Sequence, residues 1–219
     1  MRLLVSGCTV SVKRFLAERP DRIGVLQVPA AGNRLPNAPT VYAADNGCFT
    51  GLDAPKFLRM LASLVRHDHP PLWVSCPDVV GDAGETWRRF HQWAPMLREI
   101  GLPVAIVLQD GAEQFRWRGQ LNAYADWYSA VFVGGSTAWK LSTEAFRLTR
   151  EAHDNGKLVH FGRVNSLRRI LWIARAQRSG FAWCDTIDGG SAVRWGDTNI
   201  PKLIRWMDAA AVDEQTILF

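Results

Sequence analysis

The stretch Val104-Ala105-Ile106-Val107-Leu108, followed at once by Gln109-Asp110-Gly111, carries the pattern that decides the fold. A continuous apolar run of this length is typical of a parallel strand that is buried on both faces. The polar and small residues that follow it in the sequence would then lie at the carboxyl end of the strand. The same pattern recurs along the chain. The strands it predicts cover residues 2–6, 23–28, 40–44, 72–75, 104–108, 130–133, 157–161 and 181–184.

Segments with helical periodicity alternate with these strands. In residues 54–67, for example, Phe57, Leu61 and Leu64 follow the 3.6-residue spacing of an amphipathic helix. Alternating strands and helices predict a parallel sheet, and eight strands favour a single (β/α)8 barrel over residues 1–219. An open doubly wound sheet is the alternative. The other helices are expected at 11–19, 83–100, 143–155, 166–178 and 199–210, and a helix or a turn is expected at 112–128.

Composition excludes several classes of protein. Of the 219 residues, 47% are hydrophobic, which is enough for a large core and argues against disorder. No apolar run approaches the ~20 residues of a membrane helix, so we expect a cytoplasmic protein without a membrane partner. The net charge of +5 permits a nucleic-acid partner. Residues 29–39, rich in Pro, Gly and Asn, form a candidate substrate loop.

A metal site is not indicated by the cysteines. The four cysteines at positions 8, 48, 76 and 184 form no C-x-x-C pair, and we expect them to be small, half-buried residues. We therefore predict no metal; the alternative is that the cysteines lie near one another in space and hold one.

Three aspartates at predicted strand ends are the candidate catalytic residues. Asp45 follows the third run, and Asp185 and Asp188 follow the last. Carboxylates on opposite sides of a barrel mouth suit chemistry at a glycosidic carbon, because one can attack while the other moves protons. The alternative is turn formation, which fits Asp188 better than Asp185. The residues alone leave open which of these two would attack.

Further strand ends supply candidate substrate-binding groups. Asp78 has no capping role, and Gln109 offers an amide that can both donate and accept hydrogen bonds. Gly134 and Gly135 would expose backbone N–H groups to a ligand oxygen, or would simply make a turn. Each signal is weak alone, but together they predict a substrate pocket on one face.

Four of these segments resemble motifs of one enzyme family. Asp45-Asn46-Gly47-Cys48-Phe49 resembles an Asp-Ser-Gly-Gly-Phe signature, and Val107-Leu108-Gln109-Asp110-Gly111 resembles a Val-Gln-Gly segment. Val133-Gly134-Gly135-Ser136 resembles Gly-Gly-Leu, and Cys184-Asp185-Thr186-Ile187 resembles Phe-Asp-Cys-Val. In this order they are similar to the tRNA-guanine transglycosylase superfamily, and most to its DNA branch in phages and bacteria, the deazapurine-in-DNA protein A family.

The resemblance implies a base exchange without a cofactor, in which guanine in DNA is replaced by a 7-deazaguanine such as 7-cyano-7-deazaguanine. Asp185 would attack the sugar, and Asp45 would assist proton transfer. Asp78 and Gln109 would bind the base edge, Gly134 and Gly135 would contact its carbonyl, and Asp188 is a further substrate contact. A homodimer is compatible with this reading.

The departures from the family pattern bear on the partner. The tRNA enzymes carry a Cys-rich zinc site near the C-terminus, but this chain has no cysteine after Cys184. The short, zinc-free form favours DNA or a small substrate over tRNA. Basic residues near the predicted mouth would contact phosphate groups. They are Arg163, Arg168, Arg169, Arg194 and Lys202.

Two other functions remain open. The same acids could transfer the glycosyl group to water, which would make the protein a nucleoside or glycoside hydrolase. A barrel that binds nucleic acid without turnover is the second alternative, and salt-dependent binding would characterise it.

Overall fold

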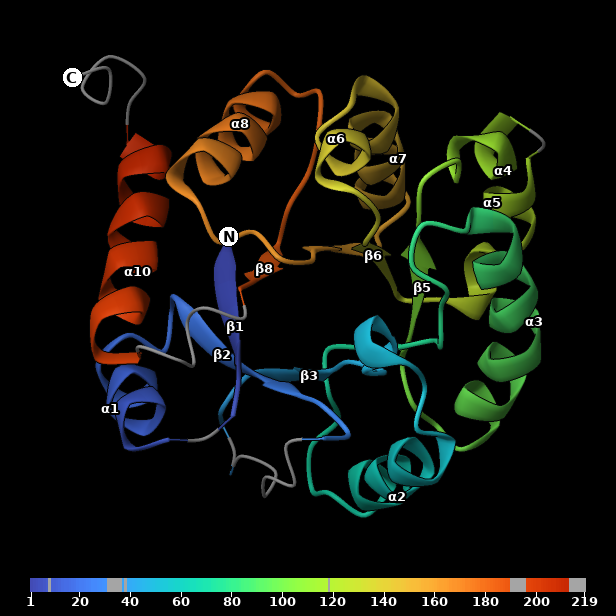
Figure 1. Cartoon of the computed structure of the whole chain (residues 1–219), viewed down its shortest axis with the longest axis horizontal. Coiled ribbons are helices and arrows are strands. Elements are labelled where there is room, and N and C mark those ends of the chain that lie inside the picture. The colour runs from blue at the N-terminus through green and yellow to red at the C-terminus, as the bar shows by residue number, and fades with distance from the viewer. Residues whose placement is uncertain (8, 31–36, 38, 118, 190–195, 213–219) are drawn as a thin grey trace.

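The chain forms a closed barrel of eight parallel strands whose spatial order is their order in the sequence. The computed structural model describes residues 1–7, 9–30, 37, 39–117, 119–189 and 196–212. Figure 1 shows the helices arranged around the outside of the strands. The (β/α)8 prediction is confirmed, and the open sheet is excluded. The strands are β1 Arg2–Ser6, β2 Ile23–Gln27, β3 Tyr42–Ala44, β4 Val74–Ser75, β5 Val104–Leu108, β6 Ala130–Val133, β7 Leu158–Phe161 and β8 Thr186–Asp188.

Most helices begin at a side-chain cap. Asp53, Asp82 and Ser166 each accept a hydrogen bond from a backbone N–H in the first turn of the following helix, which satisfies a donor that the helix itself leaves free. The α-helices are α1 Val10–Glu18, α2 Ala54–Val65, α3 Ala83–Glu99, α4 Glu113–Trp117, α5 Gln120–Ala123, α6 Thr137–Lys140, α7 Thr143–Asp154, α8 Leu167–Arg178 and α10 Gly196–Val212. The short 3-10 helices are η1 Cys48–Thr50 and η2 Ala125–Trp127.

Alternation along the strands divides the core into two layers. In β1, Leu3 and Val5 belong to the layer between strands and helices, whereas Leu4 belongs to the barrel interior. Trp73 fills the interior, with its ring 5.6 Å from that of Phe132. The inward positions near the carboxyl ends of the strands are therefore the ones that can form a site above this packed interior.

The segment 112–128, predicted as a helix or a turn, is not one continuous helix. It forms α4, α5 and η2 instead, and Gly119 between α4 and α5 has a φ of 68°. That left-handed conformation is available to glycine at low cost but interrupts a right-handed helix. The four-residue helix α6 was not predicted. It begins after the Ser136 cap.

The last strand lies further along the chain than predicted. β8 covers Thr186–Asp188 rather than 181–184, and its register pairs Thr186 with Arg2 and Asp188 with Leu4. The apolar run 181–184 packs differently, with Phe181 exposed and Cys184 in the outer core layer. The apolar run and the strand therefore cover different residues here. Because the strand starts later, Asp188 rather than Asp185 lies at the carboxyl end of the barrel.

Three other expectations concern loops, cysteines and membranes. Of the candidate loop 29–39, residues 31–36 and 38 lie outside the described residues, as do Cys8 and Arg194. Cys48, Cys76 and Cys184 are buried and unpaired. None of the described helices has the length and apolar character needed to cross a bilayer.

Candidate functional site

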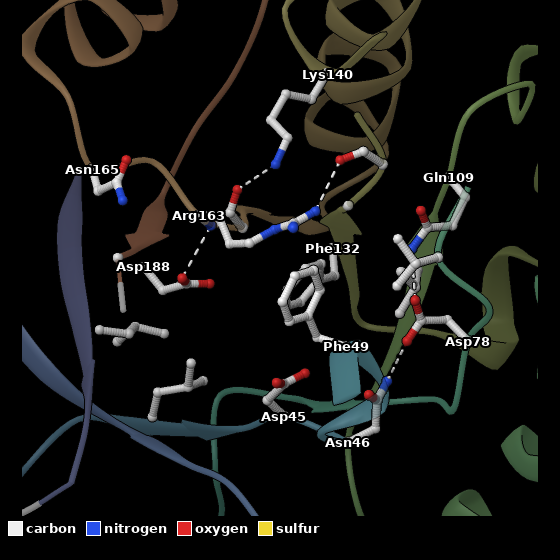
Figure 2. Close-up of a pocket in the computed structure, with 18 of the residues that line it drawn as sticks. Asp45, Asn46, Phe49, Asp78, Gln109, Phe132, Lys140, Arg163, Asn165 and Asp188 are labelled. Atoms are coloured by element: carbon white, nitrogen blue, oxygen red, sulfur yellow. Dashed lines mark hydrogen bonds between the residues drawn. The ribbon is translucent and has the colours of Figure 1, made fainter. Parts of the chain in front are cut away.

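A cavity of about 550 Å³ opens at the carboxyl end of the barrel (Figure 2). Phe132, Leu4 and Leu26 supply apolar lining, and polar groups surround them. In barrels of this kind the carboxyl end is where active sites are built. Each of the eight strands, or the loop that follows it, contributes: Ser6, Val28, Asp45, Asp78, Gln109, Gly134, Arg163 and Asp188.

Asp45 follows β3 and lines the cavity, as predicted. Its Oδ1 accepts a hydrogen bond of 3.1 Å from the Ser75 hydroxyl. Burial, and then repulsion by Asp188 and Asp78, raise the pKa of the Asp45 carboxyl to about 7. A carboxyl with this pKa can both give and take a proton near neutral pH.

Asp188 is the carboxylate on the opposite side of the same cavity. Its Oδ1 accepts the Arg163 N–H at 3.0 Å, and its Oδ2 lies 3.0 Å from His160 Nε2. Because an ionised carboxylate can only accept, we assign the ring proton to Nε2, so that the Thr186 hydroxyl donates to Nδ1 over 2.8 Å. The two contacts fix the orientation of the Asp188 carboxylate.

Asp78 and Gln109 form a buried pair in the wall of the cavity. Gln109 Nε2 donates to Asp78 Oδ2 at 2.6 Å, and Asn46 Nδ2 donates to Oδ1 at 2.9 Å. The Gly81 N–H donates a hydrogen bond to Gln109 Oε1, and this bond fixes the orientation of the amide. Burial raises the pKa of the Asp78 carboxyl, although both amides oppose the shift. This carboxyl presents acceptor atoms for the donors of a planar ligand.

Gly134 and Gly135 lie where β6 ends, at the predicted place in the cavity wall. The Gly134 N–H donates to the Leu108 carbonyl, so it is already used within the barrel. None of the described residues accepts from the Gly135 N–H, while the Gly135 carbonyl accepts from Arg163. Of the two glycines, Gly135 is therefore the one that can offer a backbone donor to a ligand.

A methyl group at position 134 would disturb the Asp78–Gln109 pair. A Cβ on Gly134 would lie 2.7 Å from Gln109 Nε2, which is too close. We expect Gly134→Ala to displace the Gln109 amide and to raise the KM for substrate by about tenfold, the effect of one lost buried hydrogen bond. Steady-state kinetics would measure this. Gly84→Ala is the control, because position 84 is exposed outside the cavity lining and a Cβ there would meet nothing closer than 3.5 Å; an equal rise in KM for both variants would contradict the explanation.

Asp185 does not lie in the cavity, so its expected position at the barrel mouth is wrong. The residue precedes β8 and belongs to the opposite, amino-terminal end, where it lines a shallow depression beside Arg2. Its Oδ2 accepts the Val159 N–H at 2.8 Å, and its Oδ1 accepts the Trp183 indole N–H at 2.9 Å. The reason is the later start of β8, which leaves Asp188 at the carboxyl end.

Two residues that the motifs did not single out complete the site. His160 is fully buried in β7. It shares the inward face of the strand with Leu158 and Gly162, whereas Val159 and Phe161 point outward. Lys140 has 1% of its surface exposed and donates to the Gly162 carbonyl at 2.6 Å. Burial, and then the Arg163 charge, lower the pKa of the Lys140 ammonium to about 8. No sequence signal indicates the burial of Lys140, because α6 is only four residues long.

The predicted basic residues differ in position. Arg163 and Arg169 line the cavity, and the Arg163 guanidinium lies 4.4 Å from the centre of the Phe49 ring. Arg168 is exposed, while Lys202 belongs to α10 and packs over Trp206. Among the described residues, no group of three or more His, Cys, Asp or Glu side chains is arranged to hold a metal ion.

Comparison with known proteins supports the barrel alone. No protein-family model matches the chain, and no curated protein matches it in sequence. Among solved structures, a citrate lyase from Burkholderia xenovorans LB400 is 10% identical, with a TM-score of 0.55 over 98% of this chain and 78% of that one. Tryptophan synthase from M. tuberculosis is 14% identical, with a TM-score of 0.44 over 96% and 91%. At 10% identity the likeness to the citrate lyase shows a shared (β/α)8 architecture and does not extend to the chemistry.

Proposed function

We propose that this chain is an enzyme that exchanges guanine in DNA for a 7-deazaguanine base, through a covalent glycosyl intermediate on Asp188. The observation that carries the proposal is the pairing of two aspartates in different surroundings. Asp188 is fixed by two hydrogen bonds, whereas Asp45 has a pKa of about 7. When two carboxyl groups in one site have such different surroundings, they usually have different roles in catalysis.

Asp188 would act as the nucleophile. One of its oxygens attacks C1′ of the target nucleotide, the bond from C1′ to guanine N9 breaks, and the electron pair leaves with the base. The hydrogen bonds from Arg163 and His160 hold the carboxylate in one orientation for this attack. Asp188 thus replaces Asp185 in the role that the sequence resemblance implied.

Asp45 would move the protons. In its protonated form it donates a proton to the departing guanine, and the resulting carboxylate then removes the N9 proton of the incoming base. That base attacks C1′, the bond to Asp188 breaks, and both aspartates return to their starting states. A pKa near 7 suits a group that must act first as an acid and then as a base.

The remaining cavity groups match a guanine-type base. Guanine carries N–H donors at N1 and at the 2-amino group, and Asp78 offers carboxylate acceptors in the wall. Phe49 stands at the cavity with 63% of its surface exposed, so the ring face that Arg163 does not cover would stack on a base. A cavity of about 550 Å³ has room for an extruded nucleotide.

The choice of DNA rests on the sequence resemblance together with charge. Arg163 and Arg169 line the cavity, and the net charge is +5, which suits a polyanionic partner. The deciding experiment incubates the protein with DNA carrying isotope-labelled guanine and with 7-cyano-7-deazaguanine, followed by mass spectrometry of the nucleosides. We expect a deazaguanosine peak and an equal loss of labelled guanine from the DNA.

Other outcomes of this experiment would identify the rival functions. Release of guanine without incorporation would indicate a hydrolase. Salt-dependent DNA binding without turnover, unchanged in the double variant Asp45→Asn and Asp188→Asn, would indicate a non-catalytic binding barrel. Exchange in tRNA but not in DNA would correct the partner while leaving the chemistry intact.

A further inference from the structure

Lys140 is a buried ammonium group that faces the cavity with hydrogen-bonding capacity to spare. An ammonium carries three donors, and in the described part of the chain only the Gly162 carbonyl accepts one of them. In the described part of the chain Lys140 Nζ has no carboxylate within ion-pair distance, and Asp188 and Asp110 act on its charge only from further away. A buried charge without a counter-ion is costly, so a ligand group that accepts hydrogen bonds is the natural partner for the remaining donors.

The charges of the cavity are arranged with a polarity. Figure 2 shows Asp78 on the side of Asn46 and Gln109, and Lys140 and Arg163 on the other side of the cavity, where Asp188 accepts the Arg163 backbone N–H. A guanine-type base has a matching polarity, because its N1 and 2-amino donors lie on one edge and its O6 and position 7 lie on another. With the donor edge on Asp78, the edge that carries position 7 turns away from Asp78, towards the cations.

We propose that Lys140 selects the incoming base by donating a hydrogen bond to an acceptor group at position 7, and that it excludes bases with a positive charge there. This inference rests on the proposed base exchange and specifies its substrate. A cyano group offers a nitrogen lone pair to the ammonium, whereas an aminomethyl group, which is protonated at neutral pH, would meet Lys140 and Arg163 as a like charge. Plain 7-deazaguanine, which carries only a hydrogen at this position, should fall between the two.

The test compares kcat/KM for three incoming bases: 7-cyano-7-deazaguanine, 7-deazaguanine and 7-aminomethyl-7-deazaguanine. We expect the wild-type protein to prefer the cyano base over 7-deazaguanine by about tenfold or more, the effect of a hydrogen bond from a charged donor. We expect Lys140→Met, which keeps the length of the side chain and removes its charge, to reduce this ratio to about one and to admit the aminomethyl base. Using the ratio within each variant cancels any general loss of activity.

Lys157→Met is the matched control. Lys157 also donates to a backbone carbonyl, that of Ala125 at 2.7 Å, but it precedes β7 at the other end of the barrel. The control should keep the wild-type ratio, and thermal melting of both variants would show that they fold. An unchanged ratio in folded Lys140→Met, or a wild-type ratio near one, would overturn the role of Lys140.

Incorporation of labelled guanine separates this inference from the function on which it rests, because guanine has no substituent at position 7. If wild-type protein incorporates guanine but treats the three deazaguanines alike, the role of Lys140 is refuted and base exchange stands. If it incorporates no base into DNA or RNA, the proposed function is refuted, and the role of Lys140 with it.

Discussion

Asp188→Asn is expected to lower base exchange by about a thousandfold or more, on the scale seen when a catalytic group is removed from a covalent mechanism, whereas Asp185→Asn should leave the rate within severalfold of wild type. The reason is position. Asp188 lies in the cavity with Asp45, whereas Asp185 lies at the opposite end of the barrel and binds Val159 and Trp183. Initial rates of labelled guanine incorporation would measure both variants.

Capture of the covalent intermediate makes this comparison sharper. With DNA and no incoming base, wild-type protein and Asp185→Asn should give a DNA–protein adduct that survives denaturing electrophoresis, and Asp188→Asn should give none. Asp185→Asn replaces one accepting oxygen by an NH2 group, so it loses one of two part-buried hydrogen bonds and should cost about 1–3 kcal/mol of stability; the assay therefore belongs well below its melting temperature. Loss of the adduct in folded Asp185→Asn, with retention in Asp188→Asn, would reverse the assignment.

The fold could be read from the sequence because its strands are buried on both faces. A run such as Val104-Ala105-Ile106-Val107-Leu108 has no polar position, and β5 begins and ends where the run does. The same rule failed at β8, which contains Thr186 and Asp188. Both side chains are polar because they bind His160 inside the barrel. A strand that supplies site residues therefore loses the apolar character by which strands are recognised.

The site was predictable to the extent that it follows strand ends. Asp45, Asp78, Gln109 and the two glycines all lie at the cavity, as the barrel pattern indicates. Lys140 could not be found in this way, because its burial depends on a single turn of helix after β6 and on the Gly162 carbonyl of a neighbouring strand. Contacts between segments so far apart in the chain leave no periodic signal.

Asp45→Asn is expected to stabilise the protein at pH 8 while it lowers base exchange by about a hundredfold, the usual contribution of a general acid–base group. Its folded-state pKa of about 7 lies above the ordinary value of 3.8 for an aspartate. Between about pH 4 and 7 the unfolded chain therefore binds fewer protons than the native protein, and stability falls as the pH rises. Above pH 7 the full penalty remains, and below pH 4 it is absent.

Urea unfolding at pH 8 and pH 4 would measure the effect. Each pKa unit corresponds to about 1.4 kcal/mol, and because Asp45 lines an open cavity, we expect Asp45→Asn to gain only about 2 kcal/mol at pH 8 after screening by solvent, and little at pH 4. An Asn side chain can still accept from Ser75, so the contact of 3.1 Å is kept. Asp53→Asn is the control, because Asn caps a helix as well as Asp does. The ion pair with Lys56 that it loses is exposed and contributes little, so the stability of this variant should change little at either pH. Equal stability of Asp45→Asn and wild type at pH 8 would mean that the cavity imposes no cost on the Asp45 carboxylate, and the same result would remove the reason for assigning it the proton transfers.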